Sequence, residues 1–337
     1  MGTTAEFDGV HATDGLPVDP AAVAAVLRPR DAASTLPRAL FLDPSVHARE
    51  MDRLFRRTWH CVGRADEVPR AGAVRTIELA GSRWSLRRVG GAVRPSPDES
   101  AGPRPSPIVE EWRGFLFATL DPDPTPVETY LGPFARRASA YPLEELRLAH
   151  RVWYEIRANW KLILENAAEC YHCPGVHPQL ARITPYLSGE DESLEGPAIG
   201  GWMELAPGRT SLTPDGRTSR AAFEGLGAPE RRRIYYYCLF PANFVSLTPD
   251  YVTLDWFVPA GPGRTRLMFD VYVHGDEPDP ADDAIAFWDA TNRQDWRVCE
   301  LAALGAKISA FTQGRYSDLE TMVHAVDRYY VRRMGFA

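Results

Sequence analysis

The sequence predicts an α+β fold, in which an antiparallel β-sheet is covered by helices. Three runs alternate apolar and polar residues, at 233–240, 251–258 and 266–274. Alternation with a period of two is typical of antiparallel strands that bury one face. Helical patterns follow at about 280–309 and 317–334. This order of elements indicates a sheet in the second half of the chain with helices packed on it.

The first half of the chain predicts a smaller, β-rich unit. Residues 44–63 have the pattern of a helix that buries Leu54, Phe55 and Trp59, while residues 91–110 are rich in Pro, Ser and Gly and predict a loop. Strands are expected at 73–79, 82–89 and 114–120, the first two joined as a β-hairpin. We therefore divide the chain into a flexible tail at 1–35, a β unit at 36–131 and a larger domain at 132–337.

Composition limits the classes of function. The chain has 337 residues, 45% of them hydrophobic and 25% charged, and its net charge is −7. An acidic chain of this kind argues against a nucleic-acid surface, and no apolar stretch approaches the ~20 residues of a membrane span. Five cysteines without a secretion signal lead us to expect a cytoplasmic protein with reduced thiols.

The segment Asn159–Leu180, NWKLILENAAECYHCPGVHPQL, is the most informative part of the sequence. Asn159 is a suitable N-cap for a helix that we expect to reach His172. On that helix Glu165, Glu169 and His172 would form one polar stripe among apolar residues, and a buried polar stripe needs partners or a metal. Pro174-Gly175 is then expected to break the helix, so that His177 folds back towards His172.

A third ligand is predicted on the helix at 280–309. Asp295 shares one face of that helix with Trp288, Asn292 and Cys299, and an ionised carboxylate there needs a partner. Two histidines and one carboxylate on one face of Fe(II) leave positions open for O₂ and substrate. The simpler alternative is a surface ion pair between Asp295 and a neighbouring arginine, Arg293 or Arg297.

Two further patterns allow several interpretations. Cys170 and Cys173 would fit a Cys₂His₂ zinc set with the two histidines, a redox C-x-x-C pair, or simple apolar packing. Five aromatic residues are candidates for a cage around a quaternary ammonium or for core packing; they are Trp202, Tyr235, Tyr236, Tyr237 and Trp256. Strand alternation predicts Tyr235 and Tyr237 on one face of their strand and Tyr236 on the other.

Both histidine and aspartate segments resemble a known family. The 159–180 segment is similar to the iron-binding helix of Rieske non-haem iron oxygenase alpha subunits, and FWDATNRQDWRVCE at 287–300 is similar to the helix that carries the third ligand. The run LFPANFVSLTPDYVTLDWFVPAGPGRTR resembles the branch that acts on glycine betaine, choline and carnitine. The resemblance covers about 36–94 and 112 to the C-terminus, and it implies a helix-grip-like catalytic domain beside a reduced Rieske domain.

The resemblance assigns roles to individual residues. It implies that His172, His177 and Asp295 hold mononuclear Fe(II). It also implies that Glu169 is the carboxylate that links the iron site to the cluster of a neighbouring subunit, and that Asn166 is a polar residue near the iron.

One departure from the family is large. Its members hold a [2Fe–2S] cluster through two cysteines and two histidines, but residues 89–112 contain no cysteine and no histidine. We therefore expect no cluster in this chain, whose first 150 residues contain a single cysteine, Cys61.

These features predict the catalytic subunit of a Rieske-type oxygenase. It would use Fe(II) and O₂ to hydroxylate or N-demethylate a small molecule, such as a quaternary ammonium compound or an amine. Electrons would come from a separate Rieske-bearing partner chain and an upstream reductase, within a trimeric or mixed oligomer. The alternative is a non-catalytic subunit that stabilises or regulates a complete oxygenase, and a third possibility is an iron enzyme reduced by its substrate or a free ferredoxin.

Overall fold

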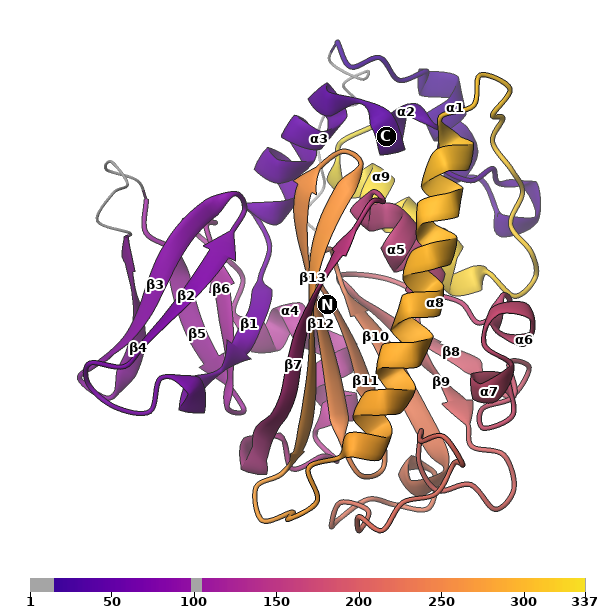
Figure 1. Ribbon diagram of the computed structural model, residues 1–337. Helices are drawn as coiled ribbons and strands as arrows, with labels where there is room; N and C mark the ends of the chain where they lie inside the picture. Colours follow the sequence, from indigo (N-terminus) through magenta and orange to yellow (C-terminus); the bar gives the residue numbers. More distant parts are fainter. Residues whose placement is uncertain (1–14, 98–104, 337) are drawn as a thin grey trace, which may run out of the picture.

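A seven-stranded antiparallel sheet forms the centre of the computed structural model, which describes residues 15–97 and 105–336. The strand order is β7-β13-β12-β11-β10-β9-β8 (Figure 1). The strands are β7 (Leu146–Ile156), β8 (Glu190–Ser193), β9 (Ala198–Glu204), β10 (Arg233–Leu239), β11 (Asn243–Leu247), β12 (Val252–Gly261) and β13 (Arg264–His274). The three strands predicted from alternation are therefore confirmed, as β10, β12 and β13.

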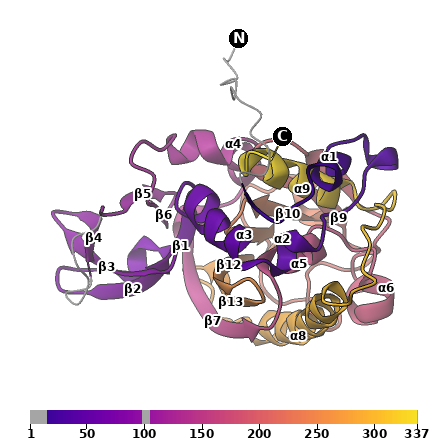
Figure 2. The same ribbon diagram turned by 90° about the horizontal axis from the view of Figure 1, so that it is seen from above.

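Helices cover both faces of this sheet (Figure 2). One face packs against α5 (Trp160–Ala167), α8 (Asp282–Ala306) and α9 (Thr321–Arg333), and the opposite face packs against α4 (Val127–Ala138). Two short helical turns, α6 (Cys173–Val176) and α7 (Pro178–Ala181), follow α5. The α+β fold class predicted from the sequence is confirmed. None of the described helices is long and apolar enough to cross a membrane.

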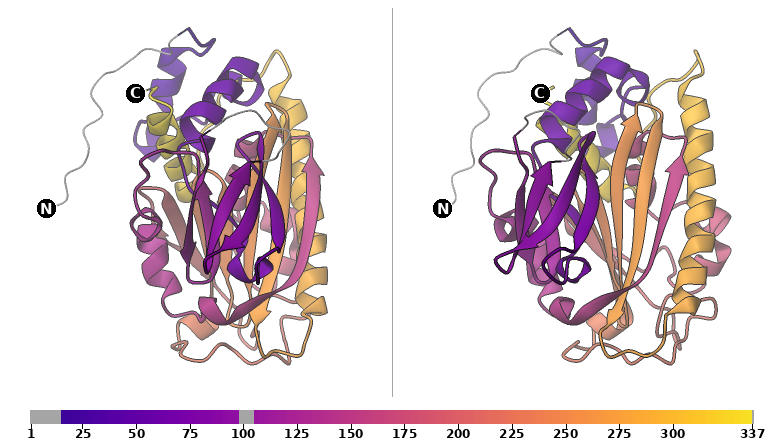
Figure 3. Two further views of the ribbon diagram at one scale, coloured as in Figure 1. Left: turned by 90° about the vertical axis from the view of Figure 1, so that its left-hand side faces the viewer. Right: turned by 60° about the vertical axis from the view of Figure 1, so that its left-hand side comes forward.

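Two three-stranded sheets form a lobe beside the large sheet (Figure 3). Their orders are β1-β6-β5 and β2-β3-β4. The strands are β1 (His60–Arg64), β2 (Val74–Leu79), β3 (Ser82–Val89), β4 (Ala92–Pro97), β5 (Ile108–Trp112) and β6 (Phe115–Thr119). The hairpin prediction is confirmed by the antiparallel pairing of β2 with β3.

Two predictions for this lobe are wrong. The segment 91–110, expected to be a loop, contains β4 and the beginning of β5, because strand pairing satisfies the backbone of a segment whose composition alone suggests a turn. The helix expected at 44–63 divides into α3 (Pro44–Glu50), a π-helical turn at Met51–Phe55 and strand β1. Leu54, Phe55 and Trp59 are buried as expected.

Much of the predicted tail is instead folded, since the described residues from 15 onward pack on the main core. The helices α1 (Pro20–Val26) and α2 (Ala39–Leu42) bury Val23, Val26 and Leu40 in the main core, and α1 lies against α9. Gln313 secures the segment by donating its side-chain N–H to the backbone oxygens of Ala22 and Thr35. An Ala-rich sequence therefore gains its order from the C-terminal helix. The rest of the predicted tail, residues 1–14, lies outside the described residues.

Candidate metal centre

Helix α5 delivers the first part of the centre but ends earlier than predicted. Asn159 caps it, accepting the backbone N–H of Lys161 at 3.0 Å as expected, but the helix stops at Ala167. The Glu169 carboxylate accepts the backbone N–H groups of Tyr171 and His172, which a continuing helix would have bonded internally. The predicted stripe is therefore wrong, and Glu165 lies away from the histidines, beside Lys161.

The chain after α5 brings the two histidines together. The rings of His172 and His177 lie 5.1 Å apart between centroids, and their Nε2 atoms are 3.2 Å apart. Pro174 lies in the first turn of α6 rather than breaking a longer helix. The expected pairing of the imidazoles is thus present, although the backbone reaches it by a different path.

Asp295 completes a convergent set of three ligand atoms. Its Oδ1 lies 2.8 Å from Nε2 of His177 and 3.2 Å from Nε2 of His172. No two of these atoms are more than 4.8 Å apart. The alternative surface pairing does not occur, since Arg293 instead donates to Asp289 at 2.8 Å.

Hydrogen bonds on the outer side of each ligand fix its orientation. His172 Nδ1 donates to Glu169 Oε1 at 2.5 Å, and His177 Nδ1 donates to Gln294 Oε1 at 2.7 Å. Both Nε2 atoms are thereby free to accept a metal ion. Asn166 donates to Asp295 Oδ1 at 2.7 Å, which holds the carboxylate in the centre.

His172 and Asp295 share a proton in the absence of a metal ion, so a proton and a metal cation compete for the same groups. Burial by itself would lower the pKa of His172, but the carboxylates of Asp295 and Glu169 raise it to about 9. Burial by itself would raise the pKa of Asp295, but hydrogen bonds to His172 and His177 lower it below its ordinary value. A metal ion would take the place of that proton between the three groups.

The donor set fits a mononuclear non-haem iron. Two neutral imidazole nitrogens and one carboxylate oxygen meet on one side, in the pattern of the facial triad of Fe(II) oxygenases. The cysteines contribute nothing to it, because Cys170 and Cys173 are joined in a disulfide that spans His172. The zinc interpretation is therefore wrong, and so is the expectation that all five thiols are reduced. The packing interpretation holds, since Cys173 is buried in the main core and Cys170 packs against it.

A cavity of about 270 Å³ opens directly onto the three ligands. Its walls come from β9 to β12, from α8 and from the loop after α5; Tyr236, Phe244, Trp202 and Trp288 supply aromatic surface. The alternation prediction is confirmed, because Tyr235 and Tyr237 pack into the core on the opposite face of the sheet. Trp256 does not line this cavity, so the five aromatic residues do not form one cage.

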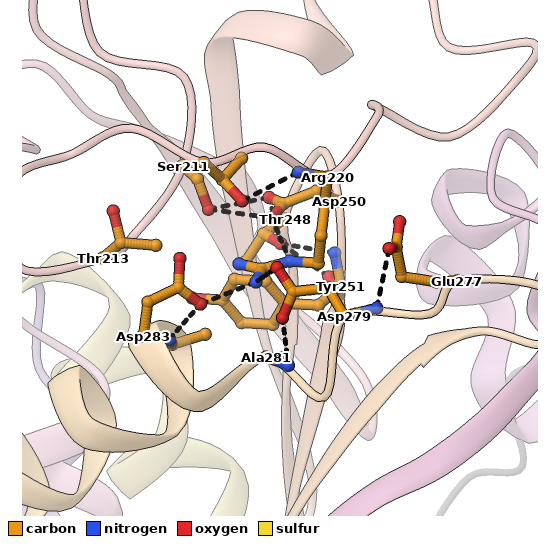
Figure 4. Close-up of polar contacts among 12 residues, drawn as sticks. Ser211, Thr213, Arg220, Thr248, Asp250, Tyr251, Glu277, Asp279, Ala281 and Asp283 are labelled. Atoms are coloured by element: carbon orange, nitrogen blue, oxygen red, sulfur yellow. Dashed lines mark hydrogen bonds and ion pairs between the residues drawn. The ribbon is translucent and has the colours of Figure 1, made fainter.

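Figure 4 shows a polar cluster around the buried side chain of Arg220. Arg220 is fully buried and pairs with Asp250, Asp279 and Asp283 at 3.0, 3.3 and 2.6 Å. Its guanidinium also lies 5.8 Å from the centre of the Tyr251 ring.

Tyr251 connects this cluster to the cavity wall. Its hydroxyl donates to the backbone oxygen of Leu212 at 2.9 Å and accepts the indole N–H of Trp288 at 2.8 Å. Through Tyr251 the cluster therefore fixes the position of the Trp288 ring, which lines the cavity.

Two residues of the site were not predicted from the sequence. Gln294 precedes Asp295, and nothing in its helical position distinguishes it from a solvent-facing glutamine. Asp255 lies on β12 and lines the cavity. A signal for it existed, since it occupies the same face of an alternating strand as Thr253 and Phe257, where an apolar side chain is expected.

The fold and the donor set together indicate the class of mononuclear non-haem iron proteins, and comparisons with known proteins then show the family. Residues 143–335, more than half of the chain, match the family model described as ring hydroxylating alpha subunit (catalytic domain). The chain therefore belongs to this family, and it is a Rieske-type non-haem iron oxygenase.

Curated relatives and solved structures give the same result. The chain is 24% identical to the glycine betaine monooxygenase oxygenase subunit of Chromohalobacter salexigens, over 88% of this chain and 84% of that protein. It is also 24% identical to the carnitine monooxygenase oxygenase subunit of Escherichia coli K12, over 84% and 87%. The crystal structure of the quaternary ammonium Rieske monooxygenase CntA with an inhibitor superposes with a TM-score of 0.75 at 20% identity, covering 96% of this chain and 99% of that one.

Proposed function

We propose that the chain is the catalytic subunit of a Rieske-type oxygenase that hydroxylates or N-demethylates a small quaternary ammonium compound or amine. The observation that carries this proposal is the convergence of His172, His177 and Asp295 at the end of an aromatic-lined cavity. Relatives named as glycine betaine and carnitine monooxygenase subunits support the substrate class.

His172, His177 and Asp295 would hold the iron. Fe(II), when bound, supplies the activation of O₂ for insertion into a C–H bond. The protein contributes orientation: Glu169 and Gln294 fix the two imidazoles, and Asn166 fixes the carboxylate. Trp288 and Tyr236 bound the space in which a substrate must lie.

Electrons would reach this site from another chain. A [2Fe–2S] cluster needs four protein ligands, and the lobe of small sheets offers only Cys61 and His60 next to each other. Both are buried, and the Cys61 backbone bonds to Asn243 while His60 bonds to Phe55. Burial raises the pKa of the Cys61 thiol to about 12, which disfavours the thiolate that binds iron. We therefore assign the cluster to a Rieske-bearing partner.

Metal analysis of the purified chain tests the proposal. We expect one iron per chain, loss of that iron in His172→Ala, and no absorption or electron-paramagnetic signal of a two-iron cluster. His274→Ala is the matched control, since His274 lies on the surface with Glu145 and should leave iron content unchanged. A native chain that binds no iron would contradict the proposal and favour a non-catalytic subunit.

A second experiment addresses the link to the partner. Glu169 bonds His172 on the side away from the other ligand atoms, so we expect Glu169→Gln to keep its iron. Turnover coupled to the Rieske-bearing partner should fall, because the carboxylate that connects the two metal sites is lost. Unchanged coupled turnover would contradict this role for Glu169.

A further inference from the structure

The cavity beside the metal ligands has a strongly one-sided charge. Among the described residues that line it, there are six carboxylates and no lysine or arginine; the carboxylates are Glu169, Glu190, Asp191, Asp255, Asp295 and Asp318. A cavity of this sign concentrates cations and repels anions. Its described lining also offers no lysine or arginine to receive an acid group of a substrate.

Among the described carboxylates of this set, Asp255 is distinguished by a buried oxygen that has no hydrogen-bond partner. Its Oδ1 is enclosed and receives no hydrogen bond from any part of the chain that the structure describes. The side chain remains partly exposed, and that exposed surface lines the cavity rather than the outside of the molecule. A buried carboxylate without a donor is costly unless a ligand provides one.

Aromatic rings flank Asp255 on both neighbouring strands. Phe244 on β11 and Phe269 on β13 are its direct cross-strand partners, so all three side chains point to the same face of the sheet. The Phe244 ring stacks with Tyr236 at 6.3 Å, and the Phe269 ring contacts Trp288 at 6.0 Å. A carboxylate set between aromatic rings is suited to a cationic nitrogen, which gains an ion pair and cation–π contacts together.

We propose that Asp255 is the specificity-determining counter-ion of the substrate, and that it selects an ammonium group that still carries an N–H over a fully methylated one. This inference rests on the proposed function, since it names the substrate class of the same cavity. An N–H donates a charge-assisted hydrogen bond to the unpartnered carboxylate, whereas a quaternary nitrogen offers only methyl groups.

The surroundings of Asp255 make its ionisation depend on a bound cation. Burial, together with the neighbouring carboxylates of Asp270 and Asp295, raises the pKa of Asp255 well above its ordinary value. A cation bound in the cavity acts in the opposite direction and stabilises the ionised carboxylate.

The test compares two head-group probes on the full chain, without reductant, so that binding is measured apart from turnover. Isothermal titration should show trimethylammonium, which has one N–H, binding at least about tenfold more tightly than tetramethylammonium. In Asp255→Asn, binding of trimethylammonium should weaken about tenfold and the preference should disappear. Asp318→Asn is the matched control, because that carboxylate at the cavity rim is 93% exposed and pairs with Arg30.

Three results would overturn the inference: equal or tighter binding of tetramethylammonium, no measurable binding of either cation, or an unchanged preference in Asp255→Asn. The comparison of the two probes on the native chain needs no variant, so it stands even where Asp255→Asn fails to fold. Iron content is measured separately. If the chain binds iron but shows no preference between the two cations, the role of Asp255 is contradicted while the proposed function stands.

Discussion

Each histidine of the proposed metal centre donates one ring N–H to a side-chain oxygen. For His177 that acceptor is Gln294 Oε1, which also receives the side-chain N–H of Gln179 at 2.8 Å. An oxygen that accepts two N–H groups fixes the amide orientation and, through it, the tautomer of His177. We therefore infer that Gln294 acts as a positioning residue for His177 and is not itself one of the proposed ligands.

We expect Gln294→Leu to weaken Fe(II) affinity about 10–100-fold, since the imidazole loses the acceptor that directs Nε2 to the centre. Competition with a calibrated chelator measures the change. Gln179→Leu is the matched control, because it removes the hydrogen bond from Gln179 to Gln294 but keeps the one from His177 to Gln294. Equal losses in both variants would show that the effect is general loosening rather than orientation of His177.

A third histidine, His60, is buried in a fully satisfied neutral form. Its Nε2 donates to the backbone oxygen of Phe55 at 2.7 Å, and its Nδ1 accepts the indole N–H of Trp256 at 3.3 Å. Burial lowers the pKa of His60 to about 4. A second proton would have to displace the Trp256 bond, so the folded protein resists protonation more than the unfolded chain does.

This residue predicts a loss of stability in acid. The unfolded chain binds a proton at His60 below about pH 6.5, whereas the folded chain does so only near pH 4. Above pH 6.5 His60 is neutral in both states, so its protonation does not lower the free energy of unfolding. As the pH drops from 6.5 towards 4, the free energy of unfolding falls by about 3 kcal/mol.

Urea unfolding at pH 7.5 and pH 5 measures the effect, and His60→Gln should have a shallower dependence on pH than the native chain. The dependence should persist in part, because burial lowers the pKa values of His47 and His324 as well. A variant with the native slope would contradict the assignment to His60.

At the scale of elements, a buried ion pair joins three helices. Glu50 at the end of α3 pairs with Lys161 on α5, and both side chains are almost fully buried. The Glu50 carboxylate also accepts from Trp160 on α5 at 3.0 Å and from Tyr330 on α9 at 2.7 Å. The first turn of α5, which leads into the metal centre, is therefore tied to elements from both ends of the chain.

Lys161→Met should destabilise the protein by about 3–5 kcal/mol, because it leaves the Glu50 carboxylate buried without its counter-ion. The double variant with Glu50→Gln should recover part of that loss, since the uncompensated charge is removed. Chemical denaturation of the single and double variants measures both values. The control is Arg157→Met. The exposed Arg157 side chain lies 3.8 Å from the Glu300 carboxylate, and this ion pair should contribute under about 1 kcal/mol. If Lys161→Met is as stable as Arg157→Met, the buried ion pair between Glu50 and Lys161 does not have the proposed importance.

At the scale of the whole molecule, the small lobe and the large sheet share hydrophobic cores. One cluster combines Cys61, Phe115 and Phe117 of the lobe with Tyr237 and Val245 of the large sheet. A polar bridge adds to it, since Asn243 on β11 bonds the backbone N–H and oxygen of Cys61 at 2.8 and 3.0 Å. The boundary that we place at 131/132 remains a prediction, but the packing does not leave two independent cores.

We expect a fragment of residues 132–337 to lose the cooperative unfolding of the full chain, because it exposes the apolar face that the lobe covers. Calorimetry of the fragment and the full chain provides the comparison. A sharp transition in the fragment, with iron content preserved, would show that the catalytic part folds alone.

Local patterns were enough to predict much of the large domain. Alternation located β10, β12 and β13 because each of these strands buries an apolar face, and the apolar face of α8 placed Asp295 inward. The same patterns did not reveal β7, whose residues are mostly half-buried, or β4, whose Pro- and Ser-rich sequence forms a strand only because β3 pairs with it.

The sequence by itself determined the fold class, the family resemblance and the three convergent residues that we propose as ligands, because these depend on residue types and on short-range periodicity. Only the tertiary structure decided where α5 ends, which groups orient each histidine, and that the Asp255 carboxylate faces a cavity without a partner. The orientation of His177 depends on Gln294, more than a hundred positions away, and the chain makes such contacts only when its core packs.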